Sequence, residues 1–175
     1  MRVKKGQVWV ETVIYTLIAF TLIGAVLTFV KPKIEEIQDT TLVDQSIEML
    51  KDINVVINAA KGTAGNQRIV DITLKKGSLL IDGVNNKIIF EVESRAEYSQ
   101  PGTEITRDNL IILTENKGKL NKITLTSDYS SGYNIFYQNA DNSKLLSKST
   151  LPYKIEITNK GFQEDNKVMI DMNIK

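Results

Sequence analysis

The chain has 175 residues, a formal net charge of +1 and neither cysteine nor histidine. The length suits one domain with an appendage, and the near-zero charge gives no electrostatic reason to expect a nucleic-acid partner. The missing cysteines exclude disulfides and thiolate chemistry, and the missing histidines remove the commonest general base and metal ligand, which argues against an enzyme.

The first element is an uncharged apolar segment, residues 12–30. As a helix it would span about 28 Å at ~1.5 Å per residue, close to the ~30 Å hydrocarbon core of a bilayer. Arg2, Lys4 and Lys5 precede it, so we expect a cytoplasmic N-terminus and an exported remainder. The alternative is a buried helix of a soluble protein, but such a helix is rarely apolar on every face at this length. A cleaved secretory signal would have a shorter core and a small residue at the position of Ile23.

Glu11 stands at the cytoplasmic edge of this segment. A charged residue at the centre of a membrane helix costs roughly 2.5–3.5 kcal/mol on insertion scales, and headgroups and water reduce that cost near the end. From physical chemistry alone, Glu11 is the interfacial edge of a signal anchor or has a specific partner.

The stretch Lys4-Lys5-Gly6-Gln7-Val8-Trp9-Val10-Glu11 resembles the leader junction of archaeal type IV pilin precursors. The resemblance covers about the first 30 residues, and Trp9 stands where this class usually has serine. It implies a class III signal peptide: residues 1–6 form a leader that a prepilin peptidase removes by cutting between Gly6 and Gln7. The basic pair Lys4 and Lys5 belongs to the recognition motif.

The same resemblance implies that Gln7 and Glu11 act in filament assembly, because Glu11 becomes the fifth residue of the mature subunit. In the family, this glutamate attracts the N-terminal amine of a neighbouring subunit. Opposite charges about 4 Å apart attract by ~4 kcal/mol at an effective dielectric constant near 20, and desolvation offsets part of that. Cyclisation of an N-terminal Gln7 would remove the amine.

After the apolar segment, Lys31-Pro32-Lys33 marks the outer interface, and Pro32 either kinks or ends the helix there. Helical spacing then continues, so we predict a helix over 7–61, stopped by Gly62 and Gly65. Its second half has one apolar stripe that would dock on a globular head: Ile34, Ile37, Leu42 or Val43, Ile47, Leu50, Ile53, Val56 or Ile57, and Ala60. The intervening acids, Glu35, Glu36, Asp39, Asp44, Glu48 and Asp52, form a solvated face or contact other subunits.

From Gln67 the apolar period changes to two, which predicts strands. Eight are expected, over 70–74, 79–81, 88–92, 110–113, 123–125, 133–137, 153–157 and 168–174. Turn residues separate them at 83–86, 115–118, 139–142 and 159–161. The predicted fold class is therefore α+β: a long N-terminal helix followed by an all-β antiparallel sandwich or barrel-like head over 66–175.

Two irregular segments remain, 94–108 and 126–142. The second is rich in Ser, Asn and Tyr, which suits contact with glycans or cell surfaces, although loop and half-buried strand tyrosines are the simpler interpretation. The sequence contains no Asn-x-Ser/Thr sequon, calcium loop, phosphate loop or nucleophile motif. We therefore name no catalytic, cofactor-binding or metal-binding residue and expect no enzyme.

The leading hypothesis is a structural subunit of an archaeal type IV pilus-like filament for adhesion or surface attachment. It predicts a precursor in the cell membrane, then an extracellular homo-oligomer at the cell surface. A motility filament subunit (archaellin-like) is a rival, although such helices tend to be rich in Gly and Ala. A single-pass anchored β-domain that binds ligands without polymerising is the alternative of a different class.

Overall fold

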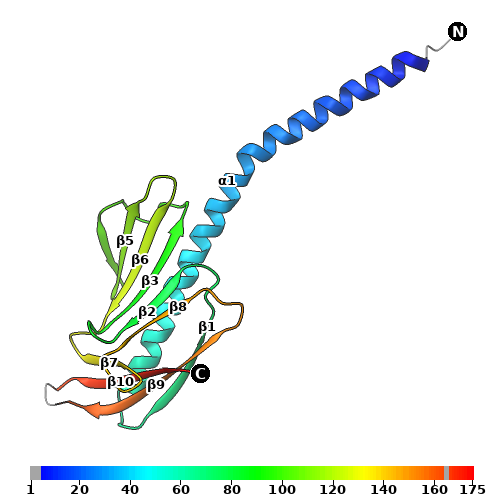
Figure 1. Ribbon diagram of the computed structural model, residues 1–175. Coiled ribbons are helices and arrows are strands. Elements are labelled where there is room, and N and C mark those ends of the chain that lie inside the picture. Colours follow the sequence, from blue (N-terminus) through cyan, green and yellow to red (C-terminus); the bar gives the residue numbers. More distant parts are fainter. Residues whose placement is uncertain (1–4, 164–165) are drawn as a thin grey trace. The chain divides into compact units, whose positions relative to one another are not determined.

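The computed structural model describes residues 5–163 and 166–175. One helix, α1 (Lys5–Ala60), precedes all the strands (Figure 1). The described strands are β1 (Gln67–Ile72), β2 (Ser78–Asp82), β3 (Lys87–Ser94), β4 (Glu104–Arg107), β5 (Leu110–Asn116), β6 (Asn121–Asp128), β7 (Tyr133–Tyr137), β8 (Ser143–Ser147), β9 (Tyr153–Phe162) and β10 (Val168–Ile174).

The chain divides into two compact units, and the division falls between Gln38 and Asp39, inside α1. The second part of the helix, from Asp39, therefore belongs to the same unit as the strands. Pro32 lies within α1 and does not end it.

The strands form two sheets, one in the order β1-β9-β10-β7 and the other in the order β4-β5-β6-β3-β2-β8. This confirms the predicted α+β class with a long N-terminal helix and a sandwich-type β head. The pairing is antiparallel except between β10 and β7, which run parallel. These two strands are not consecutive in the chain, since β7 is followed by β8 of the other sheet.

The helix and both sheets share one hydrophobic core. The alternating residues of the strands fill it as predicted, with Ile88, Phe90 and Val92 of β3 each at most 3% exposed. The apolar stripe of α1 is confirmed over its head-docked part: Val43, Ile47, Leu50, Ile53, Ile57 and Ala60 are all buried. The prediction is wrong for Ile34 and Ile37, which are 48% and 58% exposed. Figure 1 shows the cyan part of α1 lying along the strands of the head.

Two strands, β4 and β8, are not predicted from the sequence, because their apolar residues do not alternate. Every residue of β4 is exposed, and Leu146 is the only buried residue of β8. Both are edge strands of the six-stranded sheet. Edge strands bury few side chains, so their sequences need not alternate.

The predicted turn at 159–161 is wrong, because β9 continues to Phe162. The strand instead has a register shift opposite Met169 and Ile170. Gly161 has φ +102°, a backbone conformation that L side chains rarely adopt. A glycine in a strand often marks such a bulge rather than a turn. The predicted turns at 83–86 and 139–142 lie between strands as expected, whereas the one at 115–118 is shifted, because β5 continues to Asn116 and the connection to β6 is 117–120.

Candidate functional site

The candidate functional element is the apolar part of α1. Every side chain over residues 8–30 is exposed, including Trp9 at 70%, Tyr15 at 70% and Phe29 at 78%. From Val8 the helix is long and apolar enough to cross a membrane, and none of its most apolar window is buried. This apolar surface is therefore not used by the core of the chain itself, and it is compatible with membrane anchoring.

The four threonine hydroxyls in this segment form hydrogen bonds within the helix. Thr12, Thr16, Thr21 and Thr28 each donate a hydrogen bond of 2.8–2.9 Å to the carbonyl four residues earlier. In hydrocarbon an unsatisfied polar group costs several kcal/mol, so these local bonds make the threonines compatible with an apolar environment.

The structure places the predicted processing and assembly residues at the start of α1. Lys4 lies outside the described residues, whereas the backbone of Lys5, Gly6 and Gln7 forms the first turn of the helix. Glu11 is exposed. Positions 7 and 11 are four residues apart on a helix and therefore share one face.

A short charged stretch follows the apolar segment. Lys33 Nζ lies 2.8 Å from Glu36 Oε2, and both side chains are largely exposed. An exposed pair of this kind contributes roughly 0–1 kcal/mol. Its main consequence is local: it begins the polar part of α1 immediately beyond Lys31 and Pro32.

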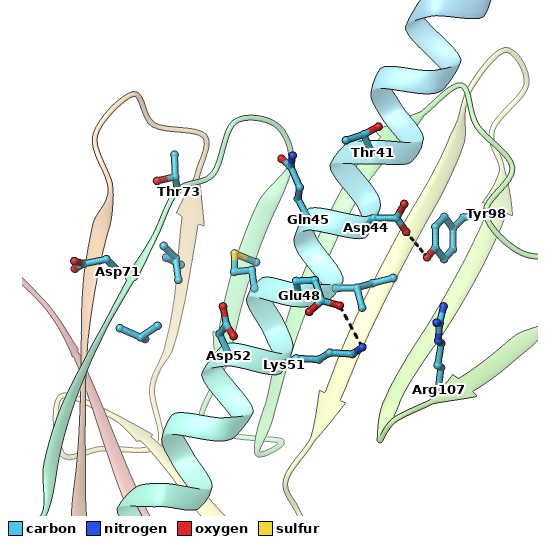
Figure 2. Close-up of a pocket in the computed structure, with 14 residues that line it drawn as sticks. Thr41, Asp44, Gln45, Glu48, Lys51, Asp52, Asp71, Thr73, Tyr98 and Arg107 are labelled. Carbon is cyan, nitrogen blue, oxygen red and sulfur yellow. Dashed lines mark hydrogen bonds and ion pairs between the residues drawn. The ribbon is translucent and has the colours of Figure 1, made fainter.

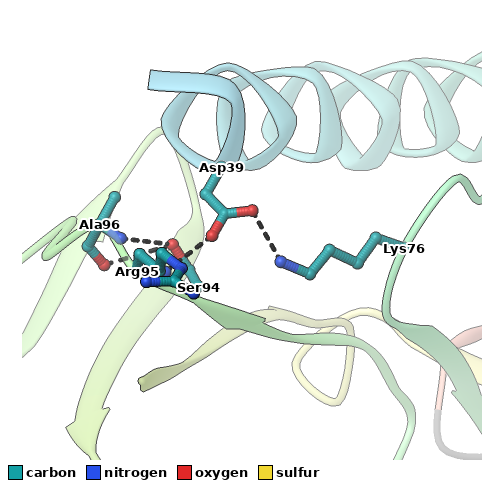
Figure 3. Close-up of polar contacts among 5 residues, drawn as sticks. All are labelled: Asp39, Lys76, Ser94, Arg95 and Ala96. Atoms are coloured by element: carbon teal, nitrogen blue, oxygen red, sulfur yellow. Dashed lines mark hydrogen bonds and ion pairs between the residues drawn. The ribbon is translucent and has the colours of Figure 1, made fainter. Parts of the chain in front are cut away.

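Asp39 attaches α1 to the head (Figure 3). Its carboxylate accepts a hydrogen bond of 2.6 Å from Lys76 Nζ and one of 2.7 Å from the backbone N–H of Arg95. The Asp39 side chain is only 14% exposed. The prediction that it belongs to a solvated acidic face is therefore wrong, because helical periodicity does not reveal which loop lies beside a residue.

A groove of about 500 Å³ is lined by α1, by residues 70–73 and by Tyr98 and Arg107. In Figure 2, Asp71 and Thr73 lie on one side of α1, and Tyr98 and Arg107 lie on the other. Asp44 accepts a hydrogen bond of 2.7 Å from the Tyr98 hydroxyl. Burial and the bond to Asp44 raise the pKa of Tyr98 to about 12. Asp44 is therefore also a head contact, although its side chain is exposed.

Lys51 makes a second link between α1 and segment 94–108. Its Nζ lies 3.3 Å from Glu48 and 3.3 Å from Asp108, and these carboxylates raise the pKa of Lys51. The Lys51–Asp108 ion pair and the Tyr98–Asp44 hydrogen bond together connect the irregular segment 94–108 to α1. These contacts hold α1 on the head. The acidic side chains that line the groove either take part in them or face solvent.

The tyrosines of segment 126–142 support the simpler interpretation. Tyr129 and Tyr137 are buried, and the Tyr133 hydroxyl donates a hydrogen bond of 2.6 Å to Asn58 of α1. Lys61 Nζ lies 5.7 Å from the centre of the Tyr133 ring. These three rings pack the head instead of forming an exposed aromatic surface.

Within the described residues no group of three or more acidic side chains is arranged to hold a metal ion. Comparisons of the chain with models of known protein families, with curated protein sequences and with solved structures gave no match.

Proposed function

We propose that this chain is a structural subunit of an archaeal type IV pilus-like extracellular filament used for surface attachment. The observation that carries the proposal is the combination of the Lys4-Lys5-Gly6-Gln7 junction with Glu11 on a helix whose most apolar window is not buried in the chain. Each part alone would be weak, since membrane anchors are common. Together they fit a subunit that is processed and then assembled through this helix.

The exposed apolar surface of α1 supports the assembly proposal, because this surface needs an apolar environment both in the precursor and in the filament. Removal of apolar surface from water is worth roughly 25 cal/mol per Å², and exposed apolar patches of this extent mark membrane or protein contacts. A bilayer supplies that environment to the precursor. A bundle of helices from other copies supplies it in an extracellular filament, so the homo-oligomer replaces the lipid.

The local geometry supports cleavage between Gly6 and Gln7. The bond lies in the first turn of α1, where helices fray, and Gly6 weakens helix formation by about 1 kcal/mol relative to alanine. A prepilin peptidase could therefore bind this stretch in an extended form without unfolding the apolar helix.

Cleavage would also create a new charged group close to Glu11. The new α-amine of Gln7 would carry a positive charge at the start of the helix, and Glu11 lies one turn later. Within a bundle, burial of the Glu11 carboxylate is costly, and pairing with the amine of another copy would offset part of that cost. The proposed pair would thus favour one axial register between neighbouring subunits.

The decisive measurement is the mass of the N-terminal peptide of the protein isolated from its own cells. A mature chain beginning at Gln7, free or cyclised, supports the filament proposal, and a free amine also keeps the Glu11 pairing possible. Replacing Gly6 with phenylalanine should leave the full-length precursor in the membrane. A native chain that begins at Met1 or Arg2 would instead favour a membrane-anchored binding domain that does not polymerise.

Assembly needs its own test. Glu11→Ala should abolish or strongly reduce filaments in electron micrographs while the mature subunit still accumulates in the membrane. Glu35→Ala is the matched control, because Glu35 lies on the same helix beyond the apolar segment. Normal filaments from Glu11→Ala would contradict the pairing.

A further inference from the structure

A second pocket lies in the head, at the junction of both sheets. Its volume is about 300 Å³, at the small end of the range for small-molecule sites. We call it the amide pocket. Its lining side chains come from four segments: Asn86 from the β2–β3 turn, Asn134 and Phe136 from β7, Asp141 from the β7–β8 loop, and Gln163, which directly follows β9.

The segments around the amide pocket are fixed by hydrogen bonds. Asn86 accepts one of 2.6 Å from the backbone N–H of Ile135 through Oδ1 and one of 2.9 Å from Tyr129 through its backbone carbonyl. The side-chain amide of Asn134 donates to Oε1 of Gln163. These bonds connect the turn after β2 to β7, and β7 to the residue that directly follows β9.

The β2–β3 turn is also fixed by contacts with residues 142 and 143, at the start of β8. Asp82 accepts hydrogen bonds from Asn85 and from the Ser143 hydroxyl, the latter of 3.0 Å. Gly83 packs so tightly that a Cβ atom there would lie 2.5 Å from the carbonyl oxygen of Asn142. The pocket is therefore preformed, which reduces the entropy lost when a ligand binds.

The pocket lies far from Asp39, the residue at the start of the head-docked part of α1. Asn86 directly precedes β3, whereas Arg95, whose backbone binds Asp39, directly follows it. The eight residues of β3 separate these points by about 26 Å at ~3.3 Å per residue. A ligand in the amide pocket would thus be bound at the opposite end of β3 from Asp39.

The chemistry of the lining side chains selects the class of ligand. Amides both donate and accept hydrogen bonds, as hydroxyl groups do. Asp141 is the only charged side chain among the described lining residues, which disfavours anions and is too few for a metal ion. Phe136 shares one face of β7 with Asn134 and adds an apolar surface. We propose that the amide pocket binds a neutral sugar residue of an oligosaccharide.

The test uses the full-length chain, purified in a zwitterionic detergent without a sugar headgroup. Neutral oligosaccharides ending in mannose, glucose, galactose or N-acetylglucosamine are titrated, and binding is followed by saturation-transfer NMR of the sugar protons. We expect at least one of them to bind, with an affinity that salt leaves unchanged because the ligand is uncharged. Asn134→Ala and Asp141→Ala should each weaken binding by about tenfold or more, as expected when a hydrogen bond to the sugar is lost.

Gln100→Ala is the matched control, since it removes an exposed amide outside the pocket. Binding by none of the sugars, binding that survives both pocket substitutions, or binding only of acidic sugars would each overturn the proposal. Asp141 lies in an exposed loop, so its variant keeps the test valid if Asn134→Ala does not fold. Sugar binding in detergent requires neither cleavage nor polymerisation, so its failure would leave the filament proposal unaffected.

Discussion

The side-chain amide of Asn159 donates a hydrogen bond of 3.0 Å to the carbonyl oxygen of Ala60, the last residue of α1. The same amide group also donates to the carbonyl of Lys61 at 3.1 Å, and its oxygen accepts from the backbone N–H of Gly161 at 2.7 Å. The last carbonyls of a helix lack partners within it. Asn159, which is 1% exposed, therefore caps the end of α1 from the middle of a sheet.

Asn159→Ala should destabilise the head by about 2–3 kcal/mol, because buried groups lose their partners at three positions. Asn159→Asp should do no better, since a carboxylate would face two carbonyl oxygens. Unfolding can be followed by near-ultraviolet circular dichroism of tyrosine, because only Tyr15 among the six tyrosines lies before Asp39. Gln67→Ala, an exposed amide on β1, is the control. Equal stabilities of the Asn159 and Gln67 variants would contradict the capping role.

Leu50 lies on the buried face of the head-docked part of α1, and Val55 lies on its exposed face. Leu50 is 1% exposed and Val55 is 65% exposed. Leu50→Ala should lower the free energy of unfolding by about 2–5 kcal/mol, because it removes buried methyl groups and leaves a cavity. Val55→Ala should change it by no more than about 0.5 kcal/mol. Chemical denaturation of both variants measures the difference, and similar values would show that the stripe does not carry the docking of the helix.

Asp39→Ala should loosen the first turn of the head-docked part of α1. The substitution leaves Lys76 and the backbone N–H of Arg95 without their carboxylate partner. We expect faster amide hydrogen exchange in the turn that follows Asp39 and little change near Ala60, because local openings involve few contacts. Asp52→Ala is the control, since Asp52 is an exposed acid of the same helix. Unchanged exchange at the start of this segment would refute the anchoring role of Asp39.

Asp82 should make the stability of the head depend on acid pH. Burial raises the pKa of its carboxyl group, but hydrogen bonds from Asn85, Ser143 and Val84 outweigh burial and hold the pKa below the ordinary value of 3.8. Because the folded-state pKa is lower than the unfolded-state pKa, the stabilising contribution is present above the unfolded value. It is lost as the pH falls through the folded value.

The measurement is the free energy of unfolding of the wild type and of Asp82→Asn between about pH 6 and pH 2. The variant should be less stable than the wild type near neutral pH, and its stability should fall less steeply below about pH 4. Glu104→Gln, on the exposed strand β4, corrects for the change in net charge. Parallel pH profiles for wild type and Asp82→Asn would show that these hydrogen bonds do not favour the ionised carboxylate.

Local patterns determined much of this protein. The uncharged run before Lys31, the stripe from Val43 to Ala60 and the alternation in β3 each depend on side chains only a few residues apart. A helix or a half-buried strand repeats its environment at a fixed interval, so its class can be read from spacing alone. The motif around Gly6 and Glu11 is equally local, and it predicts processing and assembly without any tertiary information.

The tertiary structure decided what depends on distant contacts. Asn159 and Ala60 are 99 residues apart, and the same asparagine looked like a turn residue because Gly161 follows it so closely. Segment 94–108 had no period, yet Tyr98 and Asp108 fix it to α1. The amide pocket likewise combines side chains from four separate segments. Such contacts form because the whole core packs at once, and the spacing of near neighbours carries no information about them.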